Sequence, residues 1–221
     1  MSVRRLHSEQ PSEFAFTSEN LAFAKQQIAK YPPNRQASAI IALLWQAQEQ
    51  VGGWLPEPAI RYVADMLAMP YMRALEVATF YTMFNLSPVG KYFVQLCGTT
   101  PCWLRGAEAL KSVCRKKIGA EKQMTEDGQF SWQEVECLGA CVNAPMVQIN
   151  NDFYEDLTAE SFEAILIALQ EGKEVKPGPQ NARHASEPAH TPVTTTATPT
   201  TPTTANTSTP TNTNNGENRT I

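Results

Sequence analysis

Four cysteines in two close pairs are the residues of this 221-residue chain best suited to chemistry. Four residues separate Cys97 from Cys102, three separate Cys137 from Cys141, and a long gap lies between the pairs. Two thiols on one short loop can chelate one metal atom, so two such loops can hold a four-thiolate centre. Disulfides are rare in a reducing cytoplasm, where paired cysteines are more often ligands or redox groups. The spacing therefore predicts one metal centre held by all four cysteines.

The residues between the ligands favour a [2Fe–2S] cluster. Such a cluster needs two thiolates for each iron, and backbone N–H groups that can turn toward the sulfurs. Small residues allow this turn. The first loop supplies Gly98, Thr99 and Thr100, and the second supplies Gly139 and Ala140.

Three alternatives to a cluster remain open. Structural zinc also takes four thiolates, although its commonest loops have two residues between the cysteines. Two disulfides are the second alternative. A catalytic dithiol is the third, and neither pair has its usual C-x-x-C spacing.

No motif supports another chemistry. The sequence has no glycine-rich nucleotide loop and no H-E-x-x-H zinc motif, so no catalytic residue is assigned. The three histidines, His7, His184 and His190, lie in terminal segments that we expect to be disordered. Rieske-type ligation by histidine is therefore not expected.

Two further residues lie near the first pair. Cys114 follows Leu104, Ala107 and Leu110 at helical steps, so we expect it in a buried stripe and not among the ligands. Trp103 adjoins Cys102 and either shields the centre from water or packs in the core.

Alternating and helical patterns indicate the elements that must position the cysteines. We expect strands over 91–96, 130–136, 146–150 and 153–155, with helices over 102–118 and 159–171. Thr158 can cap the last helix, whose apolar stripe is Phe162, Ile165, Leu166 and Leu169. A strand and helix followed by hairpin strands and a closing helix predict a small α/β sandwich of thioredoxin-like architecture. Both cysteine pairs then lie in loops at strand ends.

Four helices are expected before this sandwich. Ser18 can cap the first, and Pro58 and Pro70 can open the third and fourth. We expect the fourth helix to bury Leu75, Ala78 and Tyr81. Short connections favour a small antiparallel bundle, and its lack of a titratable cluster suggests a packing scaffold or a docking surface.

The chain therefore divides into four parts. They are a flexible N-terminus (1–14), a helical bundle (15–88), a thioredoxin-like α/β domain with the metal centre (89–175) and a Thr/Pro-rich tail (176–221). The tail has almost nothing to bury and is predicted to be disordered. The fold class is α/β.

Charge and hydropathy exclude several partners. The net charge of −4 and the scattered basic residues do not suggest nucleic-acid binding. Arg4 and Arg5 are not followed by an apolar region, and no run of about 18 apolar residues occurs. We expect a cytoplasmic protein that does not insert into a membrane.

The residues that carry a resemblance are VATFYTMFNLSPVGKYFVQLCGTTPCWLRGAEAL and CLGACVNAPMVQIN. They closely resemble the thioredoxin-like [2Fe–2S] subunit of respiratory complex I, known in bacteria as the E subunit, over roughly residues 15–173. The ligand pairs of that family fall on Cys97, Cys102, Cys137 and Cys141 without substitution. Thioredoxin folds usually keep a cis proline beside the active site, so a cis Ala144–Pro145 bond is predicted.

The resemblance implies a function and partners. It implies a subunit, without catalysis of its own, of a proton-translocating NADH:quinone oxidoreductase. Its [2Fe–2S] cluster would exchange single electrons with the FMN of a neighbouring flavoprotein, which alone binds FMN and NADH. The other partners would be subunits of the peripheral arm, on the cytoplasmic side of the inner membrane. Diaphorase subunits of NAD-linked hydrogenases and formate dehydrogenases share the motif and are alternatives, as is an interaction scaffold stabilised by zinc.

Overall fold

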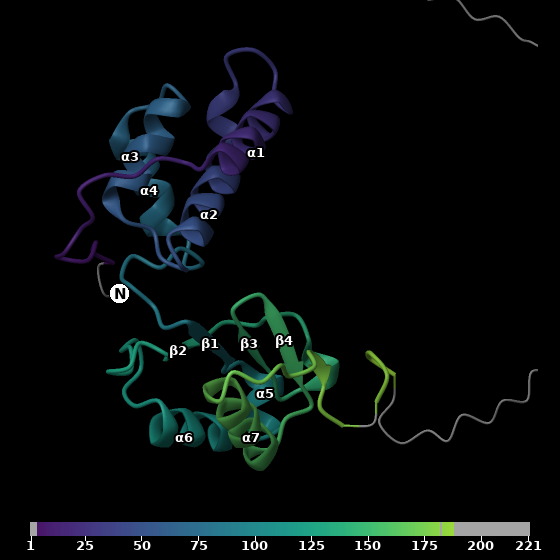
Figure 1. Cartoon of the computed structure of the whole chain (residues 1–221). Coiled ribbons are helices and arrows are strands. Elements are labelled where there is room, and N and C mark those ends of the chain that lie inside the picture. Colours follow the sequence, from purple (N-terminus) through teal and green to yellow (C-terminus); the bar gives the residue numbers. More distant parts are fainter. Residues whose placement is uncertain (1–3, 182, 188–221) are drawn as a thin grey trace, which may run out of the picture. The chain divides into compact units, whose positions relative to one another are not determined.

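Helices come first along the chain and a sheet follows in the computed structural model, which describes residues 4–181 and 183–187 (Figure 1). The four helices of the first part are connected by short turns, as the sequence predicts. They are α1 (Ser18–Ala29), α2 (Ile40–Gln50), α3 (Glu57–Met66) and α4 (Tyr71–Phe80), with a short 3-10 helix, η1 (Gln36–Ala39), before α2.

The ends of these helices differ from the prediction in two places. Thr17, not Ser18, caps α1, because the Thr17 hydroxyl accepts the N–H of Asn20 at 3.3 Å. Tyr81 lies beyond the end of α4 and is 40% exposed, so its predicted burial is wrong. Ala78 is buried as expected.

The bundle has its own hydrophobic core. Its fully buried leucine, isoleucine, valine and alanine side chains come mainly from α2, α3 and α4, and the segment after α4 adds Phe84. The largest of the buried side chains are Leu43, Leu44, Leu55, Ile60, Val63, Leu67 and Phe84. Burying each such side chain contributes roughly 1.5–3 kcal/mol, which is how short helices of modest propensity become stable.

The N-terminal segment, for which the sequence predicts flexibility over 1–14, makes contacts with the bundle. The Arg4 guanidinium donates to the carbonyls of Thr79 at 3.1 Å and Tyr81 at 2.8 Å. The N–H of His7 donates to Leu86 O at 2.9 Å. These carbonyls lie in the last turn of α4 or beyond it, where no later helical N–H group is available as a donor. Residues 1–3 lie outside the described ranges.

The second part is a five-stranded sheet in the order β2-β1-β3-β4-β5. Its strands are β1 (Tyr92–Cys97), β2 (Phe130–Val135), β3 (Val147–Ile149), β4 (Asp152–Glu155) and β5 (Gly178–Pro179). The pair β1–β2 is parallel, whereas β3 is antiparallel to both β1 and β4. This mixed sheet confirms the predicted α/β class.

Helices α6 (Ala107–Lys117) and α7 (Ala159–Gln170) lie side by side against the sheet (Figure 1). The single helix predicted over 102–118 is wrong: a separate short helix, α5 (Thr100–Leu104), ends at Arg105, and Gly106 has a φ of +105°. That left-handed conformation suits glycine and breaks the helix. The prediction for α7 is confirmed, since Thr158 accepts the N–H of Ser161 at 3.1 Å in a capping box.

The core of this part lies between the sheet and these helices. Trp132 of β2 is 1% exposed, and its indole N–H donates to Gly119 O at 2.9 Å, so the one polar atom of the ring is satisfied. The predicted stripe of α7 is buried in the same cluster. Other members include Val94, Leu96, Leu110, Met146 and Val147.

The chain stays on the sheet beyond residue 175, where the sequence predicts that a tail begins. Gly178 and Pro179 form β5 and pair in parallel with Tyr154 and Glu155 of β4. Residues 176–181 and 183–187 thus contact the sheet, residues 188–221 lie outside the described residues, and the predicted start of the tail at 176 stays a prediction. The proposed division at 88/89 stays a prediction. In the described ranges no helix is long and apolar enough to cross a membrane.

Candidate [2Fe–2S] centre

The parallel pairing of β1 and β2 brings the two cysteine loops to one edge of the sheet. Cys97, the last residue of β1, stands in register with Val135, the last residue of β2. Cys137 follows Val135 by two residues. The carboxyl ends of parallel strands share an edge, so the loops that leave them must start side by side.

The first pair is fixed by regular structure on both sides. Cys97 ends β1 and Cys102 lies in the first turn of α5; each is 1% exposed. Between them, the Gly98 N–H donates to Val135 O at 3.2 Å and the Trp103 N–H donates to Thr99 O at 2.9 Å. The loop therefore has its geometry set by the sheet at one end and by a helix at the other.

Burial raises the pKa of both thiols, and hydrogen bonds outweigh it only at Cys97. Burial alone would raise the pKa of Cys97. Hydrogen bonds from the Thr99 hydroxyl and amide, the Leu138 amide and the Cys102 thiol outweigh burial, so the pKa of Cys97 is lowered. Burial, followed by the hydrogen bond to Cys97 and the charges of Cys97 and Cys141, raises the pKa of Cys102 to about 12. Cys97 is thus the readier thiolate of the pair.

The second pair lies on an exposed loop. Cys137 and Cys141 are both exposed, and their Sγ atoms are 3.4 Å apart. This separation is far longer than the roughly 2.05 Å of a disulfide bond. The Gly139 N–H donates to Cys137 Sγ at 3.4 Å, which is the inward turn of a backbone amide that the sequence predicts. The hydrogen bond with Cys137 is the main cause of the raised pKa of Cys141, with desolvation second.

Contacts between the loops join the two pairs at one site. The Leu138 amide, from the second loop, is close enough to Cys97 of the first to lower the pKa of that thiol. Cys141 is close enough for its charge to raise the pKa of Cys102. In 4–181 and 183–187, however, no group of three or more His, Cys, Asp or Glu side chains is arranged to hold a single metal ion.

Four thiols in two pairs are the donor set that a [2Fe–2S] cluster takes. Zinc with four thiolates at about 2.3 Å in a tetrahedron needs all four sulfurs within about 4 Å of one another. A [2Fe–2S] cluster needs a close pair for each iron and a larger distance between the pairs. The donor set, with neighbouring amides that can bond sulfur, therefore fits the cluster.

An ion pair lies against the first loop. A Cβ atom at Gly98 would lie only 1.9 Å from Oε1 of Glu134. Oε2 of Glu134 is 2.9 Å from the Lys111 ammonium, which also contacts Glu108 at 2.6 Å. A side chain at 98 would therefore force the Glu134 carboxyl group to move. The sequence suggested only that a small residue was needed there.

The predicted burial of residues near the first pair is confirmed for Cys114 but not for Leu104. Cys114 is fully buried in the core and burial raises its pKa to about 12, in agreement with its expected position. Leu104 was placed on the same stripe, but it is 70% exposed because α5 ends there. Trp103 is 56% exposed and does not pack in the core. His7 and His184 are both in the described ranges and His190 is not.

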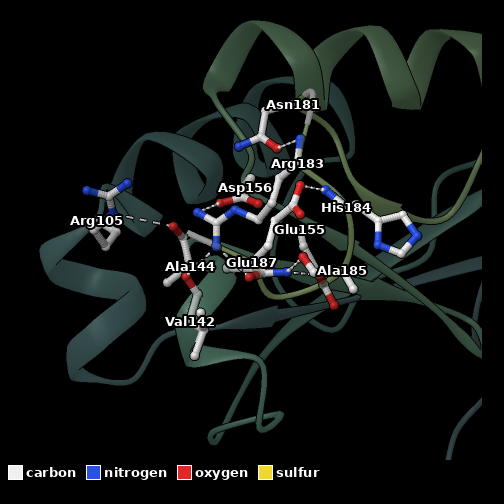
Figure 2. A network of polar contacts seen from close by, with 11 residues as sticks. Arg105, Val142, Ala144, Glu155, Asp156, Asn181, Arg183, His184, Ala185 and Glu187 are labelled. Atoms are coloured by element: carbon white, nitrogen blue, oxygen red, sulfur yellow. Dashed lines mark hydrogen bonds and ion pairs between the residues drawn. The ribbon is translucent and has the colours of Figure 1, made fainter. Parts of the chain in front are cut away.

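The sequence interpretation missed a polar network beneath the second loop (Figure 2). Arg183 donates to Val142 O at 3.1 Å and to Asn143 Oδ1 at 2.7 Å, and it pairs with Asp156 at 3.1 Å. No pattern indicated Arg183, since it lies in the segment assigned to the tail. The Ala144–Pro145 bond beside this network is cis, which confirms the prediction.

Comparison with known proteins agrees with this geometry. The family model described as thioredoxin-like [2Fe-2S] ferredoxin matches residues 24–170. The E subunit of NADH-quinone oxidoreductase from Rickettsia bellii (strain RML369-C) is 59% identical over 160 residues, covering 72% of this chain and 96% of the relative. An E subunit of the same enzyme from Rhizobium meliloti (strain 1021) is 57% identical over 194 residues, covering 85% of this chain and 70% of the relative.

A solved structure shows the same fold at greater distance. A chain of the NAD+-reducing [NiFe]-hydrogenase in the air-oxidized state superposes with a TM-score of 0.52 at 22% identity. The match covers 60% of this chain and 23% of the hydrogenase chain. The family model spans most of this chain and the Rickettsia relative matches over nearly its whole length, so the chain belongs to the thioredoxin-like [2Fe–2S] ferredoxin family.

Proposed function

We propose that this chain is the electron-transfer subunit of an NADH:quinone oxidoreductase and that Cys97, Cys102, Cys137 and Cys141 hold its [2Fe–2S] cluster. The observation that carries the proposal is that two thiol pairs meet at one edge of the sheet, where Cys97 ends β1 in register with Val135, two residues before Cys137. The names of the relatives, which are E subunits of NADH-quinone oxidoreductases, support the choice of complex.

The residues of this chain hold and shield the centre. A [2Fe–2S] cluster, when bound, supplies one-electron redox chemistry. Cys97 and Cys102 keep one side of the site away from water because they are buried between β1, α5 and the core. Cys137 and Cys141 are exposed, so an electron can enter or leave on their side. The Gly139 amide donates to Cys137 Sγ, and such a bond tunes the potential of a bound cluster.

The partner in this proposal is a flavoprotein that binds NADH and FMN, within a peripheral arm on the cytoplasmic side of the membrane. This chain has no glycine-rich nucleotide motif of its own, so hydride chemistry belongs to the partner. The likeness to the hydrogenase extends to the fold alone at 22% identity. Purification of a tagged chain from its native host tests the partner: an NADH-oxidising flavoprotein is expected, and a hydrogenase in its place would overturn the assignment.

Metal analysis and cysteine variants test the ligands. The full chain, purified without oxygen, should be brown, contain about two irons and two sulfides, and give a [2Fe–2S] EPR signal when reduced. Serine at Cys97, Cys102, Cys137 or Cys141 should each abolish or distort this signal. Cys114→Ser is the matched control, because Cys114 is a buried cysteine of the same part of the chain.

Two results would contradict the assignment. A colourless protein that contains zinc would exclude the cluster and support a scaffold stabilised by metal. Loss of the EPR signal in Cys114→Ser, together with its retention in Cys137→Ser, would show that the ligand set is wrong.

A further inference from the structure

We propose that Arg183 is a positioning residue that holds the loop of Cys141 in its ligand geometry. This inference rests on the proposed function, because it concerns a proposed cluster ligand. The segment that carries Arg183 is named here the strap, and it consists of residues 178–181 and 183–187. The strap follows α7 and belongs to the part of the sequence that was assigned to the disordered tail.

The Arg183 guanidinium connects three acceptors. Its Nη1 donates to the carbonyl of Val142 at 3.1 Å and to Oδ1 of Asn143 at 2.7 Å. Its Nη2 is 3.1 Å from Oδ1 of Asp156, and the side chains of Arg183 and Asp156 are only 6% and 5% exposed. Figure 2 shows the guanidinium between the Asp156 carboxylate and the segment of Val142. Val142 directly follows Cys141, so the contact is made one residue from a proposed ligand.

Asn143 joins the same loop to the strap and to β4. Its Nδ2 donates to Oε2 of Glu155 at 2.5 Å and to the carbonyl of Ala185 at 3.0 Å. Its own carbonyl accepts the N–H of Asp156 at 2.7 Å. The loop is therefore held by side-chain and main-chain bonds, and Asn143 is 4% exposed although Val142 is 67% exposed.

The strap is itself fixed to the sheet. Gly178 and Pro179 pair with β4, and the N–H of Gln180 donates to the carbonyl of Glu155 at 2.9 Å. Arg183 thus reaches the loop from a segment anchored on the strand that also supplies Glu155. The loop needs this support because its only regular structure is the three-residue 3-10 helix η2 (Cys141–Asn143).

Arginine suits this position for a physical reason. A guanidinium offers donors in a planar fork, so it can bond a carboxylate and two further oxygens at fixed angles, whereas an ammonium is a single charged point. Removing Arg183 alone would leave the Asp156 carboxylate buried without its counterion, which destabilises the fold. The decisive variant therefore combines Arg183→Met with Asp156→Asn. Asparagine also accepts the left-handed φ of +53° at that position.

The test uses the full chain with its cluster and compares this double variant with wild type, Arg183→Lys and Arg73→Met. Arg73 is the matched control, because it is an exposed arginine paired with Glu76 on α4. The rate at which a chelator bleaches the visible absorption measures cluster retention. We expect the double variant to bleach about ten- to hundredfold faster, the range typical of residues that support metal ligands. Arg183→Lys should bleach at a rate between those of wild type and the double variant. Arg73→Met should bleach at the wild-type rate.

A second readout separates positioning from general stability. The double variant should keep the unfolding midpoint of the cluster-free chain but change the g-values or line width of the reduced cluster. Its amides over 141–144 should exchange with deuterium faster than those of wild type, in the cluster-free chain as well. Bleaching, EPR spectrum and exchange all equal to wild type would overturn the inference.

Failure of the proposed function gives a different pattern. Wild type would then contain no iron, and the bleaching experiment could not begin. The exchange measurement would still apply, because it needs no cluster: unchanged exchange over 141–144 would overturn the role of Arg183, and faster exchange would support it.

Discussion

Cys97 and Cys102 are each 1% exposed, whereas Cys137 and Cys141 are both exposed. The first pair lies where a strand ends and a helix begins, so the main chain around it belongs to regular structure. The second pair lies on an irregular loop, and Asn143 of this loop is hydrogen-bonded to the side chains of Glu155 and Arg183. One half of the site is thus part of the core, and the other is attached to it by polar contacts.

The difference indicates a division of tasks. A buried pair gives rigidity and excludes water, which strengthens the interactions of the sulfurs with nearby amides. An exposed pair gives access to a partner, but it needs support from elsewhere because an exposed loop has few contacts of its own. The following predictions test this contrast in the chain without its cluster, where the energetic role of each loop can be measured alone.

The largest effect is expected from removing the thiols in pairs. The double variant Cys97→Ala with Cys102→Ala should lower the free energy of unfolding by about 2–4 kcal/mol. Removing each buried sulfur loses its transfer free energy and creates a cavity. Cys137→Ala with Cys141→Ala should change it by about 0.5 kcal/mol or less, as is usual for exposed positions. Urea unfolding of the chain with a chelator present measures both. Equal losses would show that the second pair is also part of the core.

A smaller effect is expected at Gly98. An added Cβ would meet Oε1 of Glu134 at 1.9 Å and push this carboxyl group away from Lys111. Gly98→Ala should therefore destabilise the chain by about 1–2 kcal/mol, within the range for overpacking. The control is the double variant Gly98→Ala with Glu134→Ala, in which the clash is absent. It should recover part of the loss, and no recovery would mean that Glu134 is not the cause.

Local patterns in the sequence account for the first loop better than for the second. The spacing of the cysteines, the alternation over 91–96 and the cap at Thr158 depend on neighbours in sequence, so they could be predicted. The same reasoning extended the helix through Arg105 and placed Leu104 on its buried face. The helical pattern gave no sign that Gly106 adopts a left-handed φ, which separates α5 from α6.

The support of the second loop depends on contacts between distant residues. Arg183 and Asp156 are charged, and charged residues are rarely buried unless they are paired. Nothing near either in the sequence shows that they meet, and the Thr/Pro-rich composition beyond them favoured disorder for the whole segment. A few residues with one buried arginine can stay on a sheet when their backbone pairs with an edge strand, as β5 does with β4.

The smallest effect is expected at Gly139, the counterpart of Gly98 in the second loop. Nothing lies within 4 Å of a Cβ atom built there, but φ is +87°. Gly139→Ala should cost about 1 kcal/mol through backbone strain alone, and Gly139→Asn should cost less, because asparagine enters the left-handed region more easily. Urea unfolding of the two variants measures this difference. A cost at Gly139→Ala as large as that at Gly98→Ala, with no relief from asparagine, would mean that side chains crowd the second loop, and the contrast between a buried and an attached half of the site would fail.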